Sequence, residues 1–346
     1  MSEHVVRVLS AGTALPGPPV DTRALAERFG MDRLWEQWVD AFIGTRTRHL
    51  AIDLDSGKPN RSLADLGAEA AASALAGAGL SAQDVDVMVL GTATPDALMP
   101  ATVNVIADRL RIDDIPTFQL QSGCSGAVQV FEVARALLAT GRHRTALVLG
   151  GDVIAKHYDV TADLTALPPA ELVNYVLFGD GAGAAVLSTE DRPEAPELRA
   201  VVTRLSGLDR APGQVLNWYG QADRDSPVAP ATEDYKAIEE WVPVLAAQAA
   251  QELLDELGWE REDVAYLLPP QLSVVMTEKI TRRLDFPEAE ELSLVGETGN
   301  TGNALLFFQL ERLLANMATP SRALAVAVES SKWIRAGIAL ELRGGD

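Results

Sequence analysis

The chain has 346 residues, of which 47% are hydrophobic, and it carries a net charge of −20 at pH 7. This composition predicts a globular protein with a sizeable core, and its strong negative charge argues against nucleic acids and anionic membranes as partners. Because Cys124 is the only cysteine, an internal disulfide and a cysteine-rich zinc site are excluded, and a cytoplasmic location is expected.

The first elements in chain order are a strand at residues 5–9 and an alanine-rich helix at residues 71–80. The helix ends at a glycine, and an acidic turn and a buried strand at residues 84–90 follow it,. The N-terminal residues lack the basic start and apolar run of a secretory signal. No uncharged apolar stretch is long enough to span a bilayer, so we expect no membrane segment.

The cysteine lies in a run of small residues, 122–126, between a predicted strand at 116–120 and a predicted amphipathic helix at 128–138. Small residues permit a tight turn, so the thiol is expected at the first turn of this helix. Unpaired backbone N–H groups and the helix dipole favour an anion there, which lowers the pKa of a thiol. We therefore predict that Cys124 is a nucleophile. The alternative is a small apolar residue of the core.

A glycine-rich run at residues 178–184 invites a nucleotide-binding interpretation, but it leads into a strand rather than a helix,. We interpret it as close backbone packing between strands. The stretch 189–196 is rich in charge and proline and predicts a join between two halves, residues 1–190 and 191–346,. Residues 206–235 are irregular and are expected either to wall the site or to form a surface insertion. The histidines show no metal-ligand spacing, so no metal site is expected.

The two halves share an internal repeat. The helix, glycine, acidic turn and strand of residues 71–90 recur at 249–268, and the elbow at 123–126 recurs at 299–302,. Strands that alternate with helices predict a mostly parallel sheet in each half. If the halves pack about a pseudo-twofold axis, Cys124 and Asn300 face one central site. Chance similarity between two alanine- and leucine-rich helices is the alternative.

With these motifs, the chain resembles the 3-oxoacyl-(acyl carrier protein) synthase III-like proteins (ketoacyl synthase III-like) of the thiolase superfamily. The resemblance covers nearly the whole length and rests on residues 91–96, 98–102, 122–126, 176–184 and 299–301. It implies an α/β, thiolase-like, duplicated five-layer αβαβα fold, a homodimer, and an acyl thioester formed on the cysteine. The acyl group would come from acyl-CoA or an acyl carrier protein as a substrate, so no cofactor is expected.

The family's usual site contains a cysteine, a histidine and an asparagine, and Cys124 and Asn300 match two of them. Pro270 stands at the histidine position, and Ser273 at the nearby asparagine of the same motif. Proline has no ionisable group and no backbone N–H. The glycine-rich turn near the C-terminus also differs, and the arginine usual four residues after the entrance tryptophan is replaced by Phe42. We expect these regions to contact substrate through Trp38, Ser273 and Ser330.

Loss of the histidine bears on the reaction. Decarboxylative condensation creates an enolate that needs hydrogen-bond donors, whereas thioester formation on the cysteine depends less on the histidine. The leading prediction is an acyltransferase that passes an acyl group to an amine or hydroxyl of a small natural-product acceptor. A hydroxyl acceptor would need a base, and the candidates are Glu329, Glu297, Asp96 and His157.

Three other functions remain open. A decarboxylating 3-oxoacyl-carrier synthase of fatty acid or polyketide biosynthesis requires another donor in place of the histidine. A thioester hydrolase or unusual condensing enzyme is the second, and a non-catalytic partner subunit is the third. The basic cluster Lys279, Arg282 and Arg283 is either a docking site for an acidic carrier protein or a solvated helix face.

Overall fold

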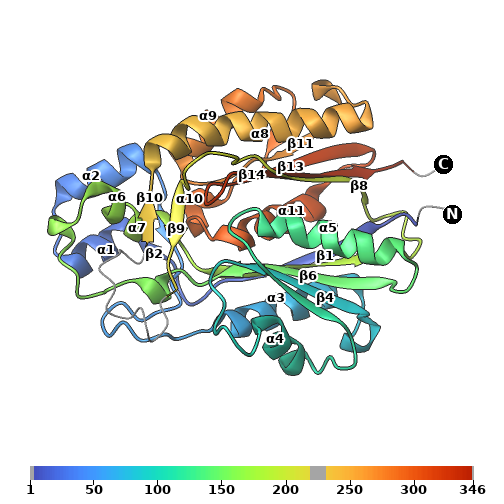
Figure 1. Ribbon diagram of the computed structural model, residues 1–346, viewed down its shortest axis with the longest axis horizontal. Coiled ribbons are helices and arrows are strands. Elements are labelled where there is room, and N and C mark those ends of the chain that lie inside the picture. Colours follow the sequence, from blue (N-terminus) through green and yellow to red (C-terminus); the bar gives the residue numbers. More distant parts are fainter. Residues whose placement is uncertain (1–3, 219–230, 345–346) are drawn as a thin grey trace.

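The computed structural model describes residues 4–218 and 231–344. Helices and strands alternate in αβαβα layers (Figure 1), as predicted. The outer helices α3 and α4 cover one array of strands, and α8 and α9 cover the other. The helices α5 and α11 lie between the two arrays. The helices are α1 (Thr22–Phe29), α2 (Arg33–Phe42), α3 (Leu63–Ala78), α4 (Thr102–Leu110), α5 (Gly126–Ala139), α6 (Pro169–Leu172), α7 (Asn174–Leu177), α8 (Tyr235–Leu257), α9 (Val274–Leu284), α10 (Val295–Thr298) and α11 (Leu305–Asn316).

Among the described residues, ten strands form one continuous sheet, in the order β12-β11-β13-β14-β8-β1-β7-β6-β4-β5. Its first-half strands are β1 (Arg7–Ala14), β4 (Val87–Thr92), β5 (Thr117–Gln121), β6 (Thr145–Asp152) and β7 (Gly181–Ser188). Its second-half strands are β8 (Glu197–Leu205), β11 (Tyr266–Leu268), β12 (Glu290–Glu291), β13 (Ser321–Glu329) and β14 (Ile334–Leu342). The two arrays have the same internal order and meet where Arg7 of β1 pairs with Glu197 of β8.

The predicted mostly parallel sheets are wrong, because each array mixes both directions. The pairs β4–β5, β4–β6, β11–β12 and β11–β13 are parallel, whereas β1–β7, β6–β7, β13–β14 and β8–β14 are antiparallel. The connection from β13 to β14 spans only residues 330–333. A link of this length cannot make the crossover that a parallel pair requires, so the strands form a hairpin.

The repeat is visible in local geometry. Helix α3 ends at Gly79 (φ 67°) and helix α8 at Gly258 (φ 63°), both in the left-handed region that glycine adopts without strain,. A short 3-10 turn and a buried strand follow each of them. Between the arrays, the rings of Phe131 in α5 and Phe307 in α11 stack with centroids 5.8 Å apart. The centre of the molecule is therefore built from equivalent helices of the two halves.

The glycine-rich run at 178–184 packs as predicted. A Cβ on Gly179 would lie 2.1 Å from the carbonyl oxygen of Thr298, and one on Gly183 would lie 2.2 Å from Cβ of Phe307. Both approaches are closer than any side chain allows, so glycine is required where β7 meets the second half. The strands on either side of residue 190 end at Ser188 and begin at Glu197, and the division of the chain at that point stays a prediction.

A group of small elements gathers at one end of the layers, on the left of Figure 1. It contains α1, α2, α6 and α7 and two small sheets. One sheet pairs β2 (Val20–Asp21) with β3 (Thr47–Arg48), and the other pairs β9 (Gln214–Leu216) with β10 (Ala231–Glu233). The β9–β10 ribbon belongs to the irregular stretch predicted at 206–235, of which residues 219–230 lie outside the described residues.

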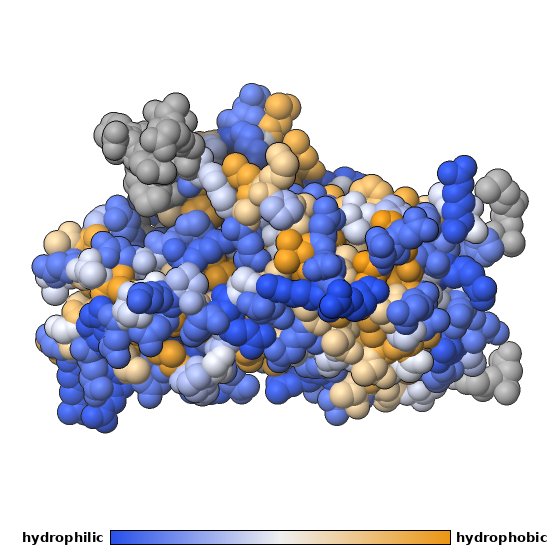
Figure 2. Space-filling model, turned by 90° about the horizontal axis from the view of Figure 1, so that it is seen from below, coloured by the Kyte–Doolittle hydropathy of each residue, from blue (hydrophilic) through white to orange (hydrophobic). Residues whose placement is uncertain are grey.

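Seen from the α3–α4 side, hydrophobic residues are interspersed among hydrophilic ones (Figure 2). Within the described ranges, no helix combines the length and the hydropathy of a membrane span. In the same part of the chain, no cluster of three or more potential metal-ligating side chains occurs.

Candidate active site

Cys124 occupies a tight elbow between β5 and α5. The turn is closed by a hydrogen bond from the backbone N–H of Gly126 to the carbonyl of Gly123, 2.8 Å long. A Cβ on Gly126 would lie 2.5 Å from Oδ1 of Asn303, so glycine is required for this close approach of the two halves. Because α5 begins at Gly126, the thiol precedes the helix by two residues. The sequence-based prediction that it lies at the first turn of the helix is therefore wrong.

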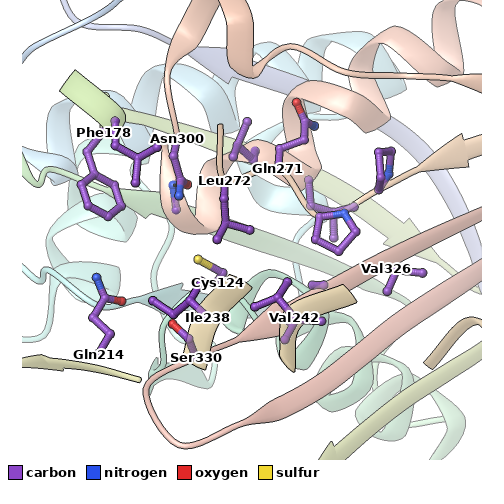
Figure 3. Close-up of a pocket in the computed structure, with 18 of the residues that line it drawn as sticks. Cys124, Phe178, Gln214, Ile238, Val242, Gln271, Leu272, Asn300, Val326 and Ser330 are labelled. Atoms are coloured by element: carbon purple, nitrogen blue, oxygen red, sulfur yellow. The ribbon is translucent and has the colours of Figure 1, made fainter. Parts of the chain in front are cut away.

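Asn300 comes from the matching elbow of the second half, after α10. Its backbone N–H donates to the carbonyl of Leu177 at 2.9 Å, and its side-chain Oδ1 accepts from the N–H of Gly302 at 3.0 Å. Asn300 is buried. Together with Cys124 it lines a cavity of about 70 Å³, which we call the thiol cavity (Figure 3). The structure thus brings one polar side chain from each half to a common space.

The wall of the thiol cavity at the expected histidine position is apolar. Pro269, Pro270 and Leu272 line it, and Leu272 projects into the space between Asn300 and Cys124 in Figure 3. Gln271 accepts hydrogen bonds through Oε1 from the backbone N–H groups of Leu294 and Val295, at 2.6 and 2.8 Å. The side-chain amide of Gln271 therefore binds the backbone at the start of α10. At the position where the family has a histidine, this chain has Pro270, which carries no ionisable group,.

The electrostatics of the thiol differ from the sequence-based expectation. Burial raises the pKa of the Cys124 thiol to about 12, with further contributions from the negative charges of Glu329 and Asp152. A backbone hydrogen bond lowers the pKa, but these effects outweigh it,. The sequence-based prediction that the pKa of the Cys124 thiol is lowered is therefore wrong. The thiol is protonated at neutral pH and must release its proton as it attacks.

Glu329, the last residue of β13, connects this strand to the elbow through hydrogen bonds. Its Oε2 accepts hydrogen bonds from the hydroxyls of Ser122 and Ser125, at 2.9 and 2.6 Å, and its Oε1 accepts one from Ser331. The carboxylate is buried and engaged by three hydroxyls. Its position supports a role in holding the elbow, and its charge acts on the thiol beside it.

Two of the predicted bases do not reach the thiol. Glu297 is exposed on α10 and pairs with Arg46 at 3.3 Å. Asp96 accepts hydrogen bonds from the backbone N–H groups of Leu63 and Ala64, at 2.9 and 2.8 Å, and so caps the N-terminus of α3,. Each carboxylate has a structural partner of its own, and neither lines a cavity that Cys124 lines.

His157 lines a second, larger cavity of about 360 Å³, which we call the polar cavity. Burial, followed by the positive charge of Lys156, lowers the pKa of the His157 imidazole, so the ring is neutral at pH 7,. The polar cavity also contains Asp152, Tyr158 and Glu171. Residues that line both the thiol cavity and the polar cavity are Cys124, Phe178, Gln214, Glu233 and Gly302.

The sequence indicated that the stretch 206–235 either walls the site or forms a surface insertion. It did not indicate which residues of the stretch reach the site. Gln214 and Glu233 face one another across the β9–β10 ribbon, and the amide of Gln214 donates to the carboxylate. Tyr235, the first residue of α8, lines the thiol cavity beside them. These residues belong to no motif, and each ribbon strand has only three residues, so the sequence carried no periodic signal for them.

The remaining predicted residues divide between two places. Ser330 lines the thiol cavity. Trp38, Ser273, Lys279 and Arg282 line a cavity of about 570 Å³ along α9, the α9 cavity. Ser273 caps α9 there by accepting from the N–H of Met276 at 3.1 Å, and Lys279 pairs with Glu239 at 2.8 Å. Arg283 is exposed on the same helix but does not line the cavity.

The α9 cavity adjoins the thiol cavity. Both are lined by Leu177, Tyr235, Ile238 and Leu272.

Comparisons with known proteins identify the family of the chain. Residues 118–204 match the model of the 3-oxoacyl-[acyl-carrier-protein] synthase III family, and residues 254–330 match the model of its C-terminal part. A solved structure titled "AbyA1 - tetronic acid condensing enzyme" is similar at a TM-score of 0.94 and 62% identity, over 97% of this chain and 99% of that one.

Two other solved structures are more distant in sequence. The synthase III of Pseudomonas aeruginosa PAO1 has a TM-score of 0.84 and 26% identity, over 98% of this chain and 99% of that one. The priming β-ketosynthase of the R1128 polyketide pathway has a TM-score of 0.83 and 26% identity, over 99% and 98%. The chain therefore belongs to the 3-oxoacyl-(acyl carrier protein) synthase III-like family of the thiolase superfamily, a family of acyl-transferring condensing enzymes.

Proposed function

We propose that this protein is a condensing acyltransferase that needs no decarboxylation. Cys124 accepts an acyl group from a carrier protein or CoA thioester and transfers it to an already acidic carbon of a β-ketoacyl thioester. The observation that carries the proposal is the thiol cavity, where Cys124 and Asn300 are present and Pro270 replaces an ionisable group. The similar structure named for tetronic acid condensation supports the choice of acceptor.

The chemistry of a tetronic acid explains why the histidine is dispensable. The ring is a five-membered lactone in which one carbon lies between two carbonyl-derived carbons. Disconnecting one carbon–carbon and one carbon–oxygen bond gives an α-hydroxyacyl thioester and a second thioester. If the second is a β-ketoacyl thioester, its central C–H is acidified by both carbonyls. A malonyl unit must instead lose carbon dioxide to form an enolate, which demands more stabilisation from the site.

The reaction proceeds in balanced steps. The Cys124 sulfur attacks the donor thioester, its proton passes to the departing thiol, and an acyl-cysteine remains. The acceptor carbon loses its proton to a base of the site and attacks the acyl carbonyl, the carbon–sulfur bond to Cys124 breaks, and the proton passes to the released sulfur. The hydroxyl of the acyl unit then attacks the acceptor thioester, which closes the lactone and releases the second thiol. Because Oδ1 of Asn300 is occupied by Gly302, its Nδ2 is the group that donates to the acyl oxygen.

A hydroxyl acceptor is the second candidate, in line with the amine or hydroxyl expected from the sequence. The neutral imidazole of His157 in the polar cavity favours it, because a hydroxyl nucleophile requires a base. An amine acceptor would need less help. Transfer to a hydroxyl, to an amine and to the carbon acid all begin from the same acyl-cysteine. The three reactions differ only in the group that attacks this intermediate.

The test is intact-protein mass spectrometry after incubation with acetyl, long-chain acyl, aromatic and α-hydroxyacyl thioesters. We expect one acyl adduct, largest with the α-hydroxyacyl donor, that is absent from Cys124→Ala. Asn300→Ala should still form the adduct but discharge it slowly. Absence of an adduct from every donor in the wild-type protein would overturn the proposal, and an adduct that persists in Cys124→Ala would place it elsewhere.

A further inference from the structure

The β9–β10 ribbon carries a carboxylate to the junction of the thiol cavity and the polar cavity. Glu233, the last residue of β10, lines both of them, as Cys124 does. Among the described residues it is the one acidic side chain that does so. Its charge also contributes to the raised pKa of the Cys124 thiol. The carboxylate and the sulfur therefore border the same space, where a substrate can contact both.

The carboxylate of Glu233 is held across the ribbon. The Nε2 of Gln214, its partner there, donates to Oε1, and Tyr235 lines the thiol cavity beside it. Burial raises the pKa of Glu233, and the hydrogen bond from Gln214 opposes this effect. A carboxylate with a raised pKa is a stronger base.

The other acidic groups near the thiol, Glu329 and Asp152, already accept several hydrogen bonds from the protein. Glu329 accepts from three serine hydroxyls of the elbow and the following turn. Asp152 accepts from backbone or side-chain groups of Thr92, Ala93, Thr94 and Asn303. Neither lines the thiol cavity, so neither faces a substrate that lies between Cys124 and Asn300.

We propose that Glu233 is the general base of the acyl-transfer step. This inference rests on the proposed function. The carboxylate removes the proton from the acceptor carbon between the two carbonyls, and the resulting carbanion attacks the acyl group on Cys124. The carbon–sulfur bond breaks, and the departing sulfur takes the proton from the Glu233 carboxylic acid. The cycle returns both groups to their starting state, and no other reactant is consumed.

The balance of basicity fits this assignment. A departing sulfur whose thiol pKa is about 12 is a stronger base than the carboxylate, so the return of the proton is favourable. Besides Cys124 and Glu233, the titratable groups that line the same cavities are His157, Tyr158, Glu171, Tyr175, Tyr235, Glu329 and Asp152. Of these, Tyr235 lies nearest to Glu233 in the chain, and burial followed by the charge of Glu233 keeps the Tyr235 pKa far above its usual value. Tyr235 therefore stays neutral beside the base.

The experiment separates the two half-reactions in Glu233→Gln and Glu233→Asp. Glu240→Gln, an exposed residue of α8, is the matched control. We expect Glu233→Gln to form the acyl-cysteine within about threefold of the wild-type rate, because acylation does not use this base. Discharge by a β-ketoacyl thioester should fall about 100-fold or more, the range for loss of a general base. Glu233→Asp should recover part of this loss, and Glu240→Gln should match the wild type.

The pH profile adds a readout that a structural role would not move. Wild-type discharge should slow toward low pH as Glu233 becomes protonated, and this acid limb should vanish in Glu233→Gln. Discharge at the wild-type rate by Glu233→Gln would overturn the inference, as would equal losses in both half-reactions with a lowered melting temperature. If the wild-type protein forms no adduct, or forms one that no carbon acceptor discharges, it is the proposed function that fails.

Discussion

At the residue scale, the chemistry depends on a proline and on the environment of one thiol. Pro270 removes the imidazole that the family places beside the cysteine, while the neighbouring wall remains apolar through Pro269 and Leu272. The thiol is buried and lies near the carboxylates of Glu329 and Asp152, and burial first and these charges second raise its pKa to about 12. A site of this kind keeps its nucleophile protonated until a thioester is bound and avoids exposing a reactive thiolate.

The thiol environment predicts how Cys124 reacts with iodoacetamide. Because alkylation requires the thiolate, the rate should keep rising with pH from 7 to 10, well below the pKa of about 12,. Glu329→Gln removes the second contribution to the raised pKa and should increase the rate at pH 8 several-fold. Glu297→Gln, exposed on α10 and outside both cavities, is the control and should change nothing. A wild-type rate that levels off below pH 9 would contradict this account.

At the element scale, buried carboxylates tie loop ends to the strands that carry the site. Asp180 precedes β7 and accepts hydrogen bonds from the backbone N–H groups of Ala51, Ile154 and Ala155, at 2.6, 2.6 and 3.0 Å. It therefore joins the segment after β3 to the segment after β6, beside Phe178 of the thiol cavity. Burial nevertheless raises the pKa of Asp180 to about 6, because the three donors do not fully replace water.

This raised pKa predicts the sign of a pH effect on stability. A carboxyl with a raised pKa in the folded state contributes stability that is complete below its unfolded pKa, near 3.8, and is lost as pH rises to about 6,. In Asp180→Asn the residue does not titrate. The unfolding free energy of the wild type relative to Asp180→Asn should therefore fall by about 2 kcal/mol between pH 4 and pH 7,. Urea unfolding of both proteins at several pH values measures this difference. A difference that stays constant, or that grows with pH, would show that the carboxyl is not destabilised by burial.

At the scale of the whole molecule, the duplication determines which features could be predicted from the sequence. The helix-ending glycines Gly79 and Gly258 and the two elbows lie in the same chain, so their alignment predicted the meeting of Cys124 with Asn300. The αβαβα layers were implied by the resemblance to the family. Strand direction was not predictable from apolar periodicity, since parallel and antiparallel buried strands look alike, and the mixed sheet shows this.

The thiol pKa and Glu233 were also beyond sequence reasoning, for the same physical reason. Both depend on contacts between segments far apart in the chain: Glu329 at the end of β13 reaches Ser122 and Ser125 of the elbow, and the short β9–β10 ribbon places Glu233 at the junction of two cavities. A helix N-terminus can be recognised locally, but the burial and the charges that outweigh it cannot.

The most direct test is a single turnover of protein acylated on Cys124, with the protein mass, the product mass and released carbon dioxide measured together. A β-ketoacyl thioester should discharge the adduct into one C-acylated or lactone product per cysteine, with no carbon dioxide, and a malonyl thioester should leave the adduct in place. Discharge by malonyl thioester with one carbon dioxide per turnover would contradict the account, as would discharge to water, an amine or a hydroxyl in preference to the carbon acceptor.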